Sequence, residues 1–365
     1  MLVLSKKAAG SPRGGWASRL LSTVAGLVLV TACSCGTAAA RDYIQVSGSS
    51  TVLPYAKIVA ETFGESFTNY RTPVIESGGS GAGIKEFCRG ISENTIDIAN
   101  ASRPMKKTEL KACFDAGVTE VQEVRIGYDG IVFASDIHGP NLELTPVDVY
   151  KALASKIIVD GKLVANTYKK WSEINPKLPD WEINAYIPGE KHGTREVFEE
   201  KLMTEGCKQS GAAESMKNLS MDDKAITAAC ISIRKDGRAI DIDGDYSETL
   251  ARVMSNKTGI GVFGLAFYEN NADKLKVATV NGVAPNVDTI SSGKYPVSRP
   301  LFFYVKKAHL GVIPGMKDYV EFFLSDQMIG PDSPLADYGL IPAPDSEREA
   351  QRAAFESGTV MSIDK

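Results

Sequence analysis

Hydrophobic and polar residues alternate along much of the chain in short strand-like runs, each followed by a longer run with helical spacing. Residues 43–46 alternate as in a half-buried strand, and after Pro54 the apolar positions recur every three or four residues. We expect strands at residues 43–46, 72–76, 96–99, 121–128, 131–134 and 301–305, and helices after Pro54, from residue 84, at residues 108–116 and at residues 146–154. Strands that alternate with helices in this way predict an α/β fold.

The length of 365 residues gives room for two α/β units with separate cores. We place the crossing between them at Asp129 and Gly130, where two predicted strands are joined. A return through residues 295–300 leads into the strong strand at residues 301–305. These positions predict one lobe from residues 41–127 together with 297–365, and a second lobe from residues 128–296.

The first 40 residues have the pattern of a secretory signal peptide. Residues 1–19 contain four basic residues and no acidic one, and the apolar run at residues 20–32 is too short to span a membrane. The small residues 38–40 favour cleavage after Ala40. The alternative is cleavage before Cys33 with lipidation of that cysteine. Either route predicts an exported protein.

Charge and cysteine content change after cleavage. Removing the four basic residues of the leader from the 41 in the whole chain leaves 37 against 45 acidic residues, which argues against a nucleic-acid partner. The cysteines that remain are Cys88, Cys113, Cys207 and Cys230. An even number in an exported protein predicts two disulfides. We expect Cys88 to pair with Cys113 and Cys207 with Cys230, because any other pairing would link the two lobes.

Several predicted turns combine small residues with hydrogen-bond donors. The turns at residues 47–51 and 77–83 are rich in serine, threonine and glycine, and each joins a predicted strand to a helix. A further turn at residues 100–104 places Arg103 at another strand end. Because ligands of open α/β sheets bind outside the carboxyl ends of the strands, we expect these turns to form one anion pocket.

The stretch at residues 187–198 offers similar chemistry where it changes from strand-like to helical at Gly193. Thr194 stands where a helix N-cap belongs, and the free amides and positive dipole of a first turn favour an anion. Arg195 adds a guanidinium group. The alternative interpretation is an ordinary helix start with a solvated arginine.

Five motifs occur in a fixed order behind the predicted signal peptide. They are Gly48-Ser49-Ser50-Thr51-Val52-Leu53-Pro54, Gly79-Ser80-Gly81-Ala82-Gly83-Ile84-Lys85, Asp97-Ile98-Ala99-Asn100-Ala101-Ser102-Arg103-Pro104, His192-Gly193-Thr194-Arg195, and Tyr295-Pro296 followed by Ser298-Arg299-Pro300-Leu301. Together they resemble the PstS family, the periplasmic phosphate-binding proteins of ABC-type phosphate importers. The resemblance covers nearly all of the mature chain. It implies a type II periplasmic-binding-protein fold, in which two α/β lobes are joined by two hinge strands.

The resemblance also implies a function and a ligand set. It implies a periplasmic, non-enzymatic receptor that captures inorganic phosphate between its lobes and delivers it to an ABC-type permease in the inner membrane. By position, the implied phosphate ligands lie in three of the motifs: Ser50, Thr51, the Val52 amide, Ser80, His192, Gly193 and Thr194. The structural alternatives are that the serines only cap helices and that the histidine is a turn residue.

The chain departs from the family pattern at two places. His192 stands where many members have serine, and Arg103 stands where some have an aspartate. We therefore expect Arg103 and Arg195 to supply the cationic donors and to clamp the ligand from opposite lobes.

Discrimination between phosphate and sulfate requires an acceptor, because near neutral pH only phosphate carries a proton. A buried carboxylate accepts a hydrogen bond from phosphate and repels sulfate. We assign this acceptor role to Asp129 at the predicted domain crossing, with Glu190 as the second candidate. A plain turn role for Asp129 is the alternative.

Two other classes of function stay open from the sequence. A cell-envelope sensor or adhesin could use the same fold. An exported phosphatase would need a nucleophile with a base, or a metal cluster, and three scattered histidines provide neither. We expect a monomer with no enzyme activity, no cofactor and no metal, and we interpret His138 and His309 as surface residues.

Overall fold

The computed structural model describes residues 41–190 and 193–363. The predicted signal peptide, with Cys33, lies outside these residues, and so does His192. Within the described part of the chain, no helix has the length and apolar character needed to cross a membrane.

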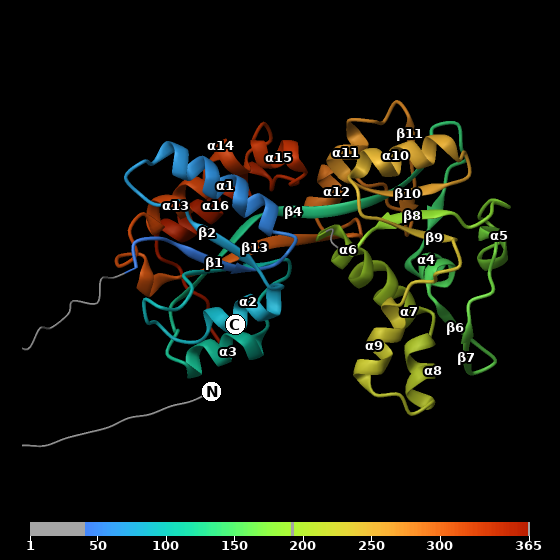
Figure 1. The fold of residues 1–365 in the computed structure, drawn as a ribbon, viewed down its shortest axis with the longest axis horizontal. Coiled ribbons are helices and arrows are strands. Elements are labelled where there is room, and N and C mark those ends of the chain that lie inside the picture. The colour runs from blue at the N-terminus through green and yellow to red at the C-terminus, as the bar shows by residue number, and fades with distance from the viewer. Residues whose placement is uncertain (1–40, 191–192, 364–365) are drawn as a thin grey trace, which may run out of the picture. The chain divides into compact units, whose positions relative to one another are not determined.

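Nine strands of the described residues form one sheet in the order β2-β1-β3-β13-β4-β10-β8-β9, with β11 also pairing with β4 (Figure 1). Their bounds are β1 Gln45–Gly48, β2 Val74–Ser77, β3 Ile98–Ala101, β4 Val121–Asp136, β8 Ala185–Pro188, β9 Ala239–Ile242, β10 Ile260–Gly264, β11 Leu275–Val277 and β13 Ser298–Lys306. The pairs of β1 with β2 and β3, and of β8 with β9 and β10, are parallel. The pairs of β13 with β3 and β4, and of β4 with β10, are antiparallel.

Two lobes share this sheet. We call the part with β1, β2 and β3 the first lobe, and the part with β8, β9 and β10 the second lobe (Figure 1). β13 pairs with β3 on one side and β4 pairs with β10 on the other, while β4 and β13 pair with each other. The prediction of two lobes joined by two hinge strands is thereby confirmed, and the hinge strands are β4 and β13. The boundaries at residues 127/128 and 296/297 stay a prediction.

The predicted break at Asp129 and Gly130 is wrong, because β4 continues through both residues. Asp129 pairs with Arg299, and Gly130 pairs with Ser298. A Cβ on Gly130 would lie 2.6 Å from Cδ1 of Ile290. A side chain at this position would have to displace Ile290, so glycine allows close packing here and does not form a turn.

Helices cover the sheet between the strands. Those of the first half of the chain are α1 Leu53–Ser66, α2 Ser80–Phe87, α3 Lys107–Asp115, α4 Pro146–Leu153 and α5 Trp171–Ile174. Those that follow in the second lobe are α6 Gly193–Phe198, the π-helix η1 Glu199–Thr204, α7 Glu205–Gln209, α8 Ala212–Asn218, α9 Asp223–Ile231, α10 Tyr246–Ser255, α11 Leu265–Glu269 and α12 Val287–Ser291. The C-terminal ones are the 3-10 helix η2 Lys307–His309, α13 Met316–Leu324, α14 Asp326–Ile329, α15 Pro334–Tyr338 and α16 Asp345–Glu356. Two small sheets pair β5 Glu143–Leu144 with β12 Thr279–Val280 and β6 Lys156–Val159 with β7 Lys162–Ala165.

The predicted helices occur, but α2 begins at Ser80 instead of residue 84, so the last glycines of the glycine-rich run lie inside the helix. A Cβ on Gly83 would lie 2.4 Å from the Cα of Gly48 in β1. This glycine therefore lets α2 pack directly on the strand end, which brings Ser80 close to the turn after β1.

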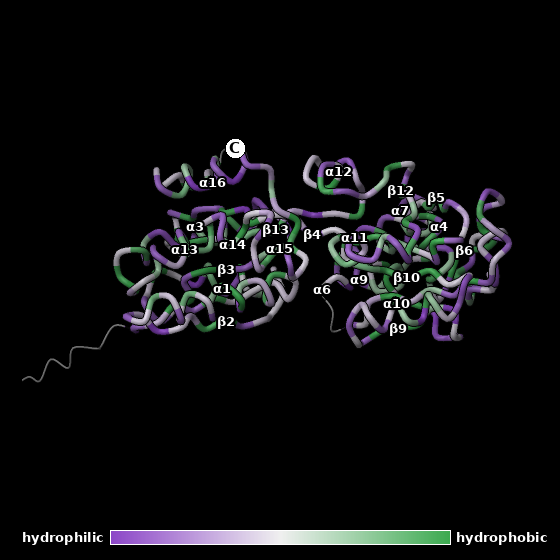
Figure 2. Tube along the Cα trace, turned by 90° about the horizontal axis from the view of Figure 1, so that it is seen from above, coloured by the Kyte–Doolittle hydropathy of each residue, from purple (hydrophilic) through white to green (hydrophobic). Residues whose placement is uncertain are grey.

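Each lobe has its own hydrophobic core. In the first lobe, alternate residues of β13 serve the two faces of the sheet: Phe303 packs with the cluster under α1 and α13, and Phe302 packs with the cluster under α2. In the second lobe one large cluster surrounds β10, which is mainly hydrophobic in Figure 2. Phe198 and Phe263 are fully buried in it. The buried helix residue Phe198 anchors α6, and this fixes the first turn of that helix at the edge of the lobe.

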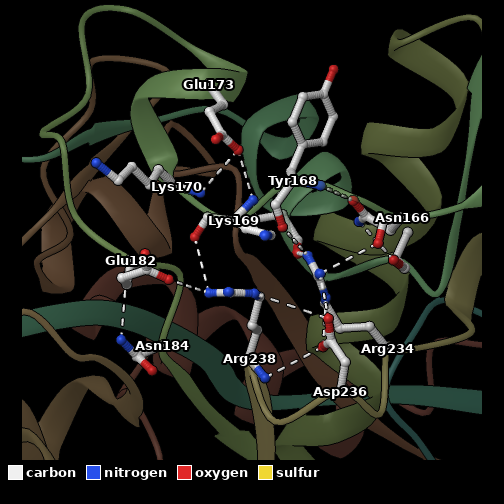
Figure 3. Close-up of polar contacts among 12 residues, drawn as sticks. Asn166, Tyr168, Lys169, Lys170, Glu173, Glu182, Asn184, Arg234, Asp236 and Arg238 are labelled. Atoms are coloured by element: carbon white, nitrogen blue, oxygen red, sulfur yellow. Dashed lines mark hydrogen bonds and ion pairs between the residues drawn. The ribbon is translucent and has the colours of Figure 1, made fainter.

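Two arginines hold the irregular segment after β7 onto the second lobe (Figure 3). The buried Arg234 donates from Nη1 to the Tyr168 carbonyl at 2.9 Å and from Nη2 to Asp236 Oδ2 at 2.6 Å. Arg238 donates to Glu182 Oε2 at 2.5 Å. A guanidinium carries five donors, so a few arginines can satisfy many carbonyls of a segment without regular structure. These two arginines therefore have a structural role.

The interpretation of His309 as a surface residue is wrong, because its exposed fraction is 1%. Its Nδ1 lies 2.6 Å from Asp97 Oδ1, and its Nε2 lies 3.0 Å from the Ile91 carbonyl. Its acceptors precede it by more than 200 residues, so no local pattern could indicate the burial.

Both predicted disulfides are present. Cys88 is bonded to Cys113 between α2 and α3 of the first lobe, and Cys207 is bonded to Cys230 between α7 and α9 of the second lobe. Neither links the two lobes, so neither restrains a change in the angle between them.

We expect the double variant Cys207→Ser/Cys230→Ser to lose about 3 kcal/mol of unfolding free energy, because in the chain-entropy model the loop of 23 residues becomes unrestrained in the unfolded state. Urea unfolding of variant and parent measures the difference. The variant Cys88→Ser/Cys113→Ser opens a loop of 25 residues and should lose a similar amount. Unfolding curves that coincide with that of the parent would contradict the prediction.

Candidate functional site

A pocket of about 280 Å³ has walls from both lobes. It is lined by Thr51, Pro54, Tyr55, Asp129, Thr194, Asp245, Tyr246 and Tyr338. Three of the predicted site residues thus meet here: Thr51 from the turn after β1, Asp129 from hinge strand β4, and Thr194 from α6. Of the three turns expected to form one pocket, only the turn after β1 contributes to this lining, so their convergence on one pocket stays a prediction.

The turn after β1 places the Thr51 side chain in the wall of this pocket. Ser49 is buried, and its Oγ accepts hydrogen bonds from the amides of Thr51 at 3.2 Å and Val52 at 3.4 Å. The Thr51 side chain is buried and lines the pocket, whereas Ser50 is exposed. The structure therefore places Thr51 in the pocket wall and leaves Ser50 at the surface; their assignments as ligands stay predictions.

Ser80 lies beside a residue that the sequence did not single out. Its Oγ is 3.1 Å from the Oγ of Ser102 and accepts a hydrogen bond from the Ser102 amide, also at 3.1 Å. Both serines are buried. Because Ser80 Oγ accepts from that amide, its own proton is available for Ser102 Oγ. Ser102 stands immediately before Arg103 in one of the five motifs, which was the available signal.

Arg299 is the buried cation of the site, and the predicted ligand set omitted it. Its exposed fraction is 3%, and its Nη2 donates to Thr51 Oγ1 at 2.8 Å. Three carboxylates surround it: Asp129 at 3.7 Å, Glu196 at 3.4 Å and Glu200 at 3.5 Å. Two signals were available: its place in the fifth motif, and its place opposite Asp129 in a hinge strand, which the predicted break in β4 concealed.

One carboxylate oxygen, Oε2 of Glu196, accepts hydrogen bonds from three of these side chains. Glu196 Oε2 accepts from Thr51 Oγ1 at 3.4 Å, from Ser102 Oγ at 3.3 Å and from Arg299 Nη2 at 3.4 Å. Glu196 belongs to α6 of the second lobe, whereas Thr51 and Ser102 belong to the first. The donors therefore converge on a point between the lobes that is occupied by an anionic oxygen.

Asp129 forms the buried acidic part of the pocket, with an exposed fraction of 4%. Burial raises the pKa of its carboxyl group, the positive charge of Arg299 opposes the shift, and the charge of Glu196 adds to it. Among the described residues, its Oδ2 has no hydrogen-bond partner. A buried carboxylate oxygen with spare acceptor capacity can receive a proton from a ligand.

Thr194 is the second residue of α6, so the helix begins one residue earlier than the predicted N-cap. Beside it in the pocket wall lies Tyr246, whose pKa is raised by burial, with a hydrogen bond from Thr194 opposing the shift. Gly193 opens the helix. The roles of Gly193 and Thr194 in holding a ligand stay predictions.

The two arginines of the predicted clamp are held within their own lobes. Arg103 donates from both Nη atoms to Glu109, at 2.8 and 2.7 Å. Arg195 is buried and donates to Glu199 Oε1 at 2.7 Å, to Asp241 Oδ1 at 2.5 Å and to the Pro188 carbonyl. These contacts neutralise both cations, and the clamp by Arg103 and Arg195 stays a prediction.

The chemistry of this group is that of oxyanion binding. Two hydroxyls and one guanidinium face the same point, and a buried acid lies beside them. Within the described residues, no group of three His, Cys, Asp or Glu side chains is placed to hold a metal ion.

Comparison with known proteins identifies relatives over most of the chain. The chain matches the family model of the PBP superfamily domain over residues 34–327. The phosphate-binding protein PstS of Staphylococcus epidermidis is 31% identical over 311 residues, which make up 83% of this chain and 80% of that protein. Protein SphX of Synechocystis sp. is 29% identical over 342 residues, covering 92% of this chain and 89% of that protein.

Solved structures show the same fold. The crystal structure of a possible phosphate binding protein from Planctomyces limnophilus has a TM-score of 0.66 and 28% identity, with coverage of 87% of this chain and 98% of that one. An ABC-type phosphate transport receptor from Vibrio cholerae has a TM-score of 0.55 and 17% identity, with coverage of 82% and 99%. The expected periplasmic-binding-protein fold is thereby confirmed. From the superfamily match and the identity to the curated relatives, the chain belongs to the PBP superfamily and, within it, to the PstS family.

Proposed function

We propose that this protein is an extracytoplasmic solute-binding protein that captures inorganic phosphate between its lobes and delivers it to an ABC-type permease. The observation that carries the proposal is the convergence of Thr51, Ser102 and Arg299 on a single acceptor oxygen beside the pocket. An oxyanion presents the same kind of acceptor, and hydrogen bonds from a charged donor to it are the strong ones. Members of the family that carry the name phosphate-binding protein support this choice of ligand.

Binding in this arrangement couples to hinge motion. Thr51 and Ser102 lie in the first lobe, Thr194 lies in the second, and Arg299 and Asp129 lie in the two hinge strands. An anion held by donors of both lobes favours the angle at which all of them reach it, which is the usual logic of hinge closure around a ligand. Of the predicted ligands, Thr51 and Thr194 fit this picture best, and we add Ser102 and Arg299 to them. Ser80 supports Ser102 through their hydrogen bonds.

Selectivity for phosphate over sulfate is proposed to come from Asp129. Its Oδ2 is buried in the pocket region without a hydrogen-bond partner among the described residues. Because burial raises the pKa of this carboxyl group, it is a better proton acceptor than a solvated aspartate. Glu190, the second candidate, is exposed. A ligand without a proton would leave the Asp129 carboxylate facing another anion.

Membership of this family supports a proposal about where the protein acts and with which partner. We propose that it acts outside the cytoplasmic membrane, as a monomer and without enzymatic activity, with a membrane permease as its partner. The relative from Staphylococcus epidermidis is named a phosphate-binding protein, which supports a binding role. A cell-envelope sensor or adhesin on the same fold is the second candidate, because capture of phosphate between two lobes would serve a sensor equally.

We expect Arg299→Met to weaken phosphate binding by about 3 kcal/mol, roughly a hundredfold, because a buried anion loses its charged partner. Isothermal titration calorimetry of the purified exported protein with phosphate measures the loss. Arg252→Met, which removes an exposed ion pair on α10, is the matched control and should bind as the parent does. Arg195→Met decides between the two arginines, since a larger loss in that variant would return the cationic role to Arg195 and contradict the assignment to Arg299.

We expect Asp129→Asn to narrow the ratio of phosphate to sulfate affinity by about two orders of magnitude or more, because the acceptor for the ligand proton is removed. Competition titrations of variant and parent with the two anions give this ratio. Asp245→Asn, a change of the same type in the wall of the same pocket, should leave the ratio unchanged. If Asp129→Asn excludes sulfate as strongly as the parent, the selectivity role of Asp129 is wrong.

A further inference from the structure

The charge around Arg299 raises a question that the proposed function does not answer. One guanidinium faces Asp129, Glu196 and Glu200, and the nearby Arg195 is already paired with Glu199 and Asp241. Three carboxylates around one buried guanidinium give this group an excess of negative charge before any ligand binds. A phosphate ion brings further negative charge to the same place, which disfavours keeping all three carboxylates beside Arg299.

Glu196 is the carboxylate whose position conflicts with a bound anion. Thr51 and Ser102 each have one hydroxyl proton, and each directs it at Glu196 Oε2, at 3.4 and 3.3 Å. A proton given to Glu196 is not available to a ligand. Arg299 Nη2 also faces this oxygen, at 3.4 Å. The carboxylate oxygen therefore receives the same three donors that an oxyanion would use.

The direction of the hydrogen bonds between the serines also shows that Glu196 occupies the place of an oxyanion acceptor. The Ser102 amide donates to Ser80 Oγ, so the Ser80 proton can go to Ser102 Oγ and the Ser102 proton to Glu196. The chain of hydroxyls ends on Glu196 because a carboxylate only accepts. Replacing Glu196 by a phosphate oxygen would leave each of these hydrogen bonds with the same direction. The first lobe can therefore exchange one acceptor for the other without rearrangement.

The Glu196 side chain is exposed enough to solvent to move away from Arg299. Its side chain is 47% exposed, whereas Asp129 is buried. A half-exposed carboxylate that turns away from Arg299 is solvated by water, so its departure costs little compared with that of a buried acid. The contacts of 3.3 to 3.4 Å are also longer than the usual charge-assisted hydrogen bond.

We propose that Glu196 is an internal competitor of the anion: its carboxylate occupies the donors of Thr51, Ser102 and Arg299 in the empty site, and the bound anion displaces it. Glu196 thus sets the affinity of the site without being a ligand. The inference rests on the proposed function, because it assumes that the displacing anion is phosphate. Its consequence is that removing the carboxylate charge strengthens binding, whereas removing the charge of a ligand-holding residue weakens it.

The test is calorimetric titration of the purified exported protein and its variants with inorganic phosphate. We expect Glu196→Gln to bind phosphate about tenfold more tightly than the parent, equivalent to about 1.4 kcal/mol. Glu196→Ala should also bind more tightly, which excludes the introduced amide as the cause. Glu214→Gln removes the same charge at an exposed position on α8 and should bind like the parent.

The possible results separate the two proposals. Phosphate binding by the parent, with equal or weaker binding by Glu196→Gln and Glu196→Ala, overturns the competitor role and leaves the proposed function standing. Weaker binding would mean that the carboxylate holds the ligand. No phosphate binding by the parent and by both variants alike overturns the proposed function, and this inference with it. Tighter binding by both variants, with Glu214→Gln unchanged, supports the competitor role.

Discussion

The candidate site depends on one permanently charged group that is shielded from water. A guanidinium group has five donors and no acceptor, so acceptors must surround Arg299 in every state of the site. In the structure these acceptors are Thr51 and the carboxylates of Asp129, Glu196 and Glu200. Burying an arginine costs free energy unless acceptors surround its guanidinium group. The same need for acceptors makes a buried arginine a suitable partner for an anion, because the anion can replace an acceptor that is already there.

The pairing of the hinge strands decides where this charge lies. Arg299 of β13 is opposite Asp129 of β4, and both strands pass between the lobes. A change in the angle between the lobes therefore leaves the cation and its buried acid together. It moves Thr51, on the first lobe, relative to Glu196, on the second. The contacts of Arg299 with Thr51 and Glu196 therefore depend on the angle between the lobes, whereas its pairing with Asp129 does not.

The alternation of strands and helices, and the disulfide pairing, could be predicted because both depend on local pattern and on simple limits of geometry. The break at Asp129 and Gly130 was predicted wrongly because an Asp-Gly pair has the composition of a turn. The glycine at position 130 instead packs closely on Ile290, a residue 160 positions later in the chain, and no local pattern indicates that contact. The same error hid Arg299, since only an unbroken β4 places Arg299 opposite Asp129. The structure brings Thr51, Asp129 and Thr194 to one pocket, and their roles as ligands stay predictions, but Ser102 and Glu196 were not foreseen.

The contrast between the arginines shows what the sequence lacked. Arg103 and Arg195 stand in glycine- and serine-rich turns that are typical of anion sites, yet short contacts of 2.5 to 2.8 Å tie each of them to carboxylates of its own lobe. Arg299 stands in an apolar strand, and its ion pairs are loose, at 3.4 to 3.7 Å. Its Nε has no hydrogen-bond partner among the described residues. A tightly paired cation has little to gain from a ligand, whereas a loosely paired and buried one does. Availability of a charge for binding is thus set by its nearest acids, and those are fixed by the fold.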